Sequence, residues 1–134
     1  GGCVRLTVVA FQFFLQQGQG QIVFTSSVAA LRGSSWAPAY SASKAFLSNY
    51  AEGLHMKATK LKKEIVVTDV RPGFVNTKNS GDHKRFWVSS PQKAARQMMQ
   101  AIEQKKRVVY ISRRWWLIGQ LLKLIPFSLY RRLA

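Results

Sequence analysis

The sequence has little cysteine and few acidic side chains. Cys3 is the only cysteine among the 134 residues, so the chain offers no pair for an internal disulfide. This composition favours a reducing compartment, and we expect a cytoplasmic protein. Five Asp and Glu residues stand against 21 Lys and Arg, which gives a formal net charge of +16. Such an excess indicates an anionic partner: a nucleic acid, an acidic membrane surface or a phosphorylated ligand.

Long hydrophobic runs and metal-binding clusters are also absent from the sequence. No stretch reaches the roughly 18 uninterrupted apolar residues that a membrane-spanning helix needs. The segment LTVVAFQFFL after Arg5 is followed by QQGQGQ instead of a small-residue cleavage site, which argues against a signal peptide. His55 and His83 do not share metal-ligand spacing with cysteines or acids, so no metal site is expected.

The hydrophobic pattern predicts helices that alternate with short buried strands. A helix is expected over about 3–17, ending at Gly18, and a second over about 40–62. A third is expected to begin at Ser90, which caps it, with Pro91 in its first turn. Strands are expected over 21–27, 64–73 and 107–112. This order predicts an α/β fold, a Rossmann-like doubly wound parallel sheet. Ligands gather at the carboxyl ends of such strands, where Ser27 and Pro72 lie.

On two of these helices the apolar residues predict which face is buried. In the helix over 40–62 they are Phe46, Leu47, Tyr50, Leu54 and Leu61. In the helix that follows Ser90 they are Ala94, Ala95, Met98, Met99 and Ile102.

The stretch SSWAPAYSASKAF, residues 34–46, contains two overlapping catalytic patterns that share Lys44. Ser41 and Lys44 form an S-x-x-K pattern, but the S-D-N and K-T-G elements that accompany it in acyl-enzymes are missing. Tyr40 and Lys44 form a Y-x-x-x-K pattern. A phenol with its usual pKa of about 10 is a poor acid or base at neutral pH. A lysine four residues later lies on the same face of a helix, and its positive charge favours phenolate. The spacing therefore favours Tyr40 as the partner of Lys44.

Two further elements accompany this pair at strand ends: Ser27, 13 residues before Tyr40, and the loop PGFVNT over 72–77. With these residues the chain resembles the short-chain dehydrogenase/reductase family over about residues 1–112. The resemblance implies that Ser27 holds the oxygen of a small-molecule carbonyl or alcohol substrate and that Tyr40 transfers the proton. It implies that Lys44 supports the phenolate and binds the nicotinamide ribose.

The resemblance also implies an NAD or NADP cofactor. Its nicotinamide side would be bound by Tyr40 and Lys44 together with Pro72, Gly73, Val75 and Thr77. Phe86 and Trp87 would either wall the substrate site or pack on the core, and Ser26 is expected to be structural. The family's glycine-rich loop and Asn-Asn-Ala-Gly segment would precede Gly1. The chain thus corresponds to the C-terminal, catalytic half, which we do not expect to be a competent enzyme alone, and the choice between NAD and NADP stays open.

We expect residues 1–112 to be a partial Rossmann domain and residues 113–134 to be a cationic amphipathic tail. Cations bracket aromatic and aliphatic residues in this tail, as in a helix that lies on an anionic membrane. The alternative is a tail that packs on its own domain or across a homo-oligomer.

Other functions stay open alongside the enzyme. They are an inactive truncated relative and a basic module that binds a membrane or nucleic acid. Nucleic acid is not the expected partner, because the basic residues are dispersed and their densest cluster flanks the apolar tail.

Overall fold

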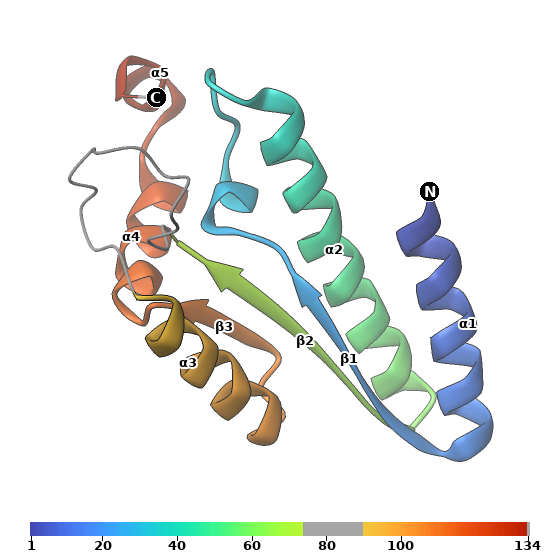
Figure 1. Cartoon of the computed structure of the whole chain (residues 1–134). Coiled ribbons are helices and arrows are strands. Elements are labelled where there is room, and N and C mark those ends of the chain that lie inside the picture. Colours follow the sequence, from blue (N-terminus) through green and yellow to red (C-terminus); the bar gives the residue numbers. More distant parts are fainter. Residues whose placement is uncertain (74–89, 134) are drawn as a thin grey trace.

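The computed structural model describes residues 1–73 and 90–133. Three strands, β1 (Gln19–Thr25), β2 (Glu64–Pro72) and β3 (Val108–Ile111), form a parallel sheet in the order β1-β2-β3. Helices α1 (Gly2–Gln17) and α2 (Pro38–Lys60) cover one face of this sheet, and α3 (Pro91–Glu103) covers the other (Figure 1). The predicted α/β class and Rossmann-like layering are therefore confirmed.

The ends of the elements follow the local signals in the sequence. Gly18 ends α1 in the left-handed conformation, with φ of 90°, and its N–H donates to the Phe14 carbonyl at 2.8 Å. Ser90 caps α3, because its Oγ accepts from the Lys93 N–H at 3.2 Å. β1 ends at Thr25, two residues earlier than expected, so Ser26 and Ser27 already belong to the loop. This loop turns through the short 3-10 helix η1 (Val28–Leu31) before α2 begins.

The central strand β2 organises the core because successive side chains point to opposite faces of the sheet. Ile65 and Val67 pack with Phe11 of α1 and Leu54 of α2. Val70 points the other way, into a cluster with Ala94 and Ile111. Val67 and Val70 are at most 1% exposed, and burial of such a side chain stabilises the fold by about 1.5–3 kcal/mol.

Parts of the two predicted helix faces are wrong. Phe46 of α2 is 49% exposed and Leu61, which follows the last residue of α2, is 46% exposed, whereas Ala51 and Ala58 are buried. In α3, Ala95 and Met99 are exposed and Ala101 is buried. Both helices approach the sheet through alanines, whose small side chains let the backbones come close. Leu54 also reaches the core, whereas Phe46 stays exposed and stacks on Tyr50 with ring centres 5.7 Å apart.

The C-terminal segment forms two helices, α4 (Arg114–Leu124) and α5 (Phe127–Leu133). Trp115 of α4 is buried in a cluster with Val28 and Tyr110. Gly119 lets the helix approach closely, because a Cβ there would lie 3.0 Å from a methyl carbon of Leu31. The sequence left open whether residues 113–134 lie on a membrane or pack on their own domain or across a homo-oligomer. For α4 the structure shows packing on the domain. Within residues 1–73 and 90–133, no helix combines the length and the apolar character needed to cross a bilayer.

Candidate active site

The candidate site lies where β1 and β2 end and α2 begins. Ser27 caps η1, since its Oγ accepts from the Ala29 N–H at 3.1 Å. The same oxygen lies 3.5 Å from the carbonyl oxygen of Pro72 at the end of β2. The loop after β1 therefore holds the Ser27 hydroxyl beside the end of the neighbouring strand.

Tyr40 and Lys44 lie one helical turn apart near the start of α2, which begins with Pro38 in its first turn. The Lys44 Nζ is 5.6 Å from the centre of the Tyr40 ring and donates to the Thr25 carbonyl at 3.2 Å. Lys44 thereby joins α2 to the end of β1, while the phenol of Tyr40 is 51% exposed.

A cavity of about 520 Å³ brings several of these residues together. Ser27, Tyr40 and Gly73 line it, and so do apolar side chains of α4. Val75 and Thr77, which the resemblance assigns to the cofactor, lie outside the described residues, as do Phe86 and Trp87. Within the described ranges, no three His, Cys, Asp or Glu side chains gather as a metal site would require.

Gly73 has a packing role that the sequence did not reveal. A Cβ at this position would overlap the indole ring of Trp115, so the absence of a side chain makes room for α4. The Gly73 N–H donates to the Ile111 carbonyl at 2.6 Å, which continues the pairing of β2 with β3. The contact between Gly73 and Trp115 fixes one wall of the cavity.

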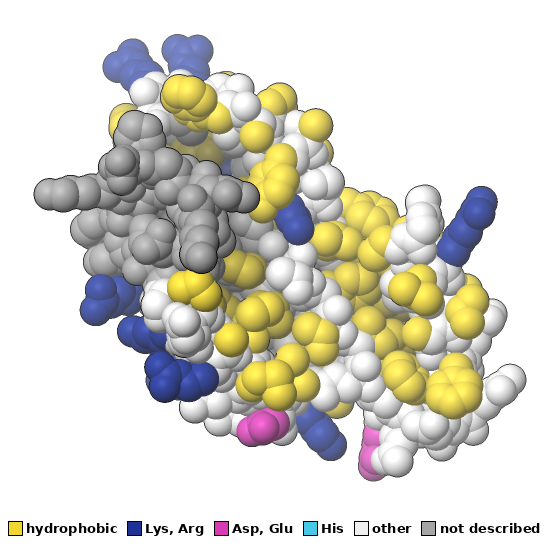
Figure 2. Space-filling view, in the orientation of Figure 1, with side chains coloured by type: hydrophobic (Ala, Val, Ile, Leu, Met, Phe, Trp, Pro, Cys, Tyr) yellow, Lys and Arg dark blue, Asp and Glu magenta, His cyan; other side chains and the backbone are white. Residues whose placement is uncertain are grey.

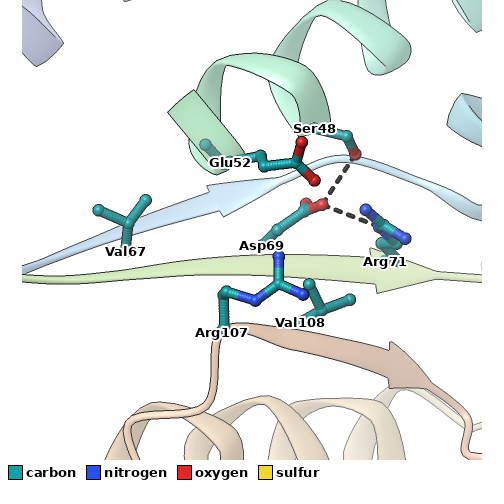
Figure 3. Close-up of a pocket in the computed structure, with 8 residues that line it drawn as sticks. Ser48, Glu52, Val67, Asp69, Arg71, Arg107 and Val108 are labelled. Atoms are coloured by element: carbon teal, nitrogen blue, oxygen red, sulfur yellow. Dashed lines mark hydrogen bonds and ion pairs between the residues drawn. The ribbon is translucent and has the colours of Figure 1, made fainter. Parts of the chain in front are cut away.

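A buried carboxylate ties the strands to α2 beneath the site. Asp69 is 3% exposed, and Figure 3 shows its side chain between α2 and the sheet. Its oxygens accept from Ser26 Oγ at 2.5 Å, Ser48 Oγ at 2.8 Å and Arg71 Nε at 2.8 Å. Ser26 is therefore structural, as expected, and its bond to Asp69 anchors the residue next to Ser27.

Arg71 extends this network to β3. Its guanidinium donates to the Tyr110 hydroxyl at 2.9 Å and lies 5.5 Å from the centre of that ring. Burial acts to lower the pKa of Arg71, but the hydrogen bonds to Asp69 and Tyr110 and the charge interactions with the same two groups together outweigh it, so the pKa is raised above its usual value. The guanidinium is thus held as a permanent cation beside Asp69.

Sequence reasoning missed Asp69 and Arg71, although a signal was present. They stand two residues apart within a strand that is otherwise apolar, which places both side chains on one face. Charged residues in a buried strand need partners, and such a pair satisfies itself. Trp115 carried no comparable signal, because its contact with Gly73 joins segments far apart in the sequence.

Comparisons with known proteins identify similar sequences and similar folds. The family model described as short chain dehydrogenase matches residues 1–86. The human 3-oxoacyl-[acyl-carrier-protein] reductase is 35% identical over 83 residues, which cover 62% of this chain and 34% of that protein. The chain therefore spans about a third of the length of this curated relative.

Solved structures show the same fold. A short-chain dehydrogenase from Burkholderia cenocepacia J2315 in complex with NADP superposes with a TM-score of 0.72 at 24% identity, over 90% of this chain and 51% of that one. A short-chain dehydrogenase from Sphingobium yanoikuyae in complex with NADPH gives 0.68 at 22% identity, over 93% and 53%. The chain thus spans about half of each of these structures.

Replacing Asp69 with Asn in the full-length protein tests the buried network. The substitution leaves the Arg71 cation without its counter-charge, and we expect unfolding to become easier by about 3–5 kcal/mol. Denaturant unfolding measures the change. Glu64→Gln, at the exposed start of the same strand, is the matched control and should stay within about 0.5 kcal/mol. A loss below about 1 kcal/mol for Asp69→Asn would contradict the role of the network.

Gly73→Ala tests the contact with Trp115. The added methyl group has to displace the buried indole, and we expect a loss of about 1–3 kcal/mol in the free energy of unfolding. Gly53 of α2 is the control, because a Cβ there meets nothing within 4 Å. Gly53→Ala should be neutral or stabilise the helix by about 0.5–1 kcal/mol. Equal effects of the two substitutions would show that Gly73 does not make room for Trp115.

Proposed function

Because the chain belongs to the short-chain dehydrogenase family, we propose that it carries the acid/base site of an NAD(P)-dependent oxidoreductase that reduces a carbonyl or oxidises an alcohol. The observation that carries this proposal is the shared cavity of Ser27 and Tyr40, with the Lys44 ammonium 5.6 Å from the centre of the phenol ring. The activity belongs to the complete protein, since the chain covers about half of the structures it resembles.

Each of the three side chains has a separate task in this proposal. The Ser27 hydroxyl donates a hydrogen bond to the substrate oxygen and holds it beside Tyr40. In the reducing direction the phenolic O–H of Tyr40 gives its proton to that oxygen, and in the oxidising direction the phenolate takes the proton back. The positive charge of Lys44 stabilises the negative charge that Tyr40 then bears.

The residues at the strand ends fit a nicotinamide cofactor. The Lys44 ammonium has three N–H donors and uses one on the Thr25 carbonyl, which leaves donors for the hydroxyls of the nicotinamide ribose. Pro72 and Gly73 provide backbone at the carboxyl end of β2, and we assign Val75 and Thr77 to the same side of the cofactor. NAD or NADP supplies or accepts the hydride, and two similar structures hold NADPH and NADP.

The other functions that the sequence left open have less support. A purely nucleic-acid-binding or lipid-binding module would not need a hydroxyl, a phenol and an ammonium at the ends of parallel strands. An inactive relative would be expected to lose one of the three residues, and all three are present. The family model therefore favours the oxidoreductase over a purely binding module, and the presence of all three residues favours it over an inactive relative.

The outer side of α4 and α5 supports a second proposal, peripheral binding to an anionic membrane. The exposed apolar residues of this tail surface are Trp116, Leu117, Leu121, Leu124, Phe127 and Leu129. They are bordered by the cations Arg113, Arg114, Lys123, Arg131 and Arg132, and no acidic residue follows Glu103. Figure 2 shows Lys and Arg beside hydrophobic side chains over α5, at the top of the view. Apolar contact and positive charge on one surface together suit an acidic bilayer.

The role of Tyr40 is tested by Tyr40→Phe in the full-length protein. Loss of the phenolic proton should lower kcat by roughly 10²- to 10⁴-fold, measured as ketone-dependent oxidation of NADH or NADPH. Tyr50→Phe is the matched control, because Tyr50 lies on the same helix but packs against the core. Its turnover should stay near that of the wild type. Undiminished turnover of Tyr40→Phe would refute the assigned role.

Membrane binding is tested by co-sedimentation with vesicles of phosphatidylcholine and phosphatidylserine. The double substitution Leu124→Glu and Phe127→Glu places acids on side chains that are 79% and 70% exposed, so the fold should persist. We expect it to abolish binding, and added salt should weaken binding of the wild type. Met56→Glu on α2, at a side chain 53% exposed, is the control and should bind normally. If both variants sediment with the vesicles equally, the tail surface is not the membrane-binding surface.

A further inference from the structure

The cavity beside Ser27 and Tyr40 is large, and its wall is mostly apolar. Its volume of about 520 Å³ falls within the range of about 300–1,000 Å³ that is typical of small-molecule sites. The apolar side chains that line it include Val28, Trp115, Ile118, Leu122, Ile125 and Leu133. A small polar substrate would leave most of this wall without a contact.

The wall is built by α4 and α5, and a clamp centred on Arg32 fixes it in place. The Arg32 guanidinium donates to the Leu122 carbonyl at 3.0 Å and to the Ile125 carbonyl. It also lies 4.1 Å from the centre of the Tyr130 ring, whose hydroxyl donates to the Gly33 carbonyl at 2.6 Å. Arg32 thus satisfies carbonyls at the end of α4 that the helix leaves unpaired. These contacts hold α4 and α5 in place beside the cavity.

The two sides of α4 can be distinguished by their contacts. Ile118 and Leu122 line the cavity, whereas Leu117 and Leu121 are 53% and 54% exposed on the tail surface. A substitution on the inner side therefore changes the size of the cavity, and the same substitution on the outer side does not.

We propose that this cavity selects a bulky, mostly apolar ketone or alcohol. The apolar body of the substrate packs against Ile118 and Leu122. The proposal rests on the proposed function, because it places the reacting oxygen at Ser27 and Tyr40.

The test compares kcat/KM of the full-length protein for butanone and 2-decanone. The wild type should prefer 2-decanone. Leu122→Trp should fill the cavity and lower kcat/KM for 2-decanone, mainly through KM, by roughly tenfold more than it lowers kcat/KM for butanone. Leu117→Trp on the outer side is the control and should leave the preference for 2-decanone as in the wild type. Should Leu122→Trp fold poorly, Leu122→Ala enlarges the cavity and should shift the preference toward longer ketones.

A wild type that turns over butanone as well as 2-decanone, or a Leu122→Trp variant that affects both alike, would overturn the assignment of a bulky substrate. No turnover of either ketone with NADH or NADPH would instead count against the proposed function itself.

Discussion

Asp69 places a carboxylate between the sheet and α2, where three donors from different segments meet it. Ser26 comes from the loop after β1, Ser48 from α2 and Arg71 from the same strand, with Tyr110 of β3 completing the network. A buried charge is tolerated only when it is paired and hydrogen-bonded, so these partners are constrained to meet in one arrangement. Because Ser26 precedes Ser27 and Ser48 lies one turn after Lys44, this arrangement also sets how the loop and the helix carrying the candidate catalytic groups face one another.

The C-terminal helices α4 and α5 enclose the candidate site on the side away from α2. Gly73 makes room for Trp115, and Arg32 holds the end of α4, so the C-terminal helices form a wall of the cavity. One side of α4 therefore faces the candidate substrate, and the other carries exposed apolar residues next to cations. One short segment, α4 and α5, thus carries both the positive charge near the C-terminus and the apolar lining of the cavity.

Local signals in the sequence predicted much of this structure. The parallel order of strands followed from alternating patterns, the ends of α1 and α3 from Gly18 and Ser90, and the proximity of Tyr40 and Lys44 from a spacing of one helical turn. What depends on tertiary contact was not predictable in this way. Nothing in the pattern of α2 shows that it approaches the sheet through Ala51 and Ala58 and leaves Phe46 at the rim. The Arg32 clamp joins residues about 90 positions apart, and no periodicity reveals such a contact.

The central claim is that Ser27 and Tyr40 hold one substrate oxygen between them, with the apolar body of the substrate against α4. A crystal structure of the full-length protein with a nicotinamide cofactor and an unreactive alcohol analogue of 2-decanone measures this directly. We expect the analogue's oxygen within about 3.2 Å of both Ser27 Oγ and Tyr40 Oη, with its chain against Ile118 and Leu122. An oxygen bound away from both hydroxyls, or a chain that lies outside the cavity, would contradict it.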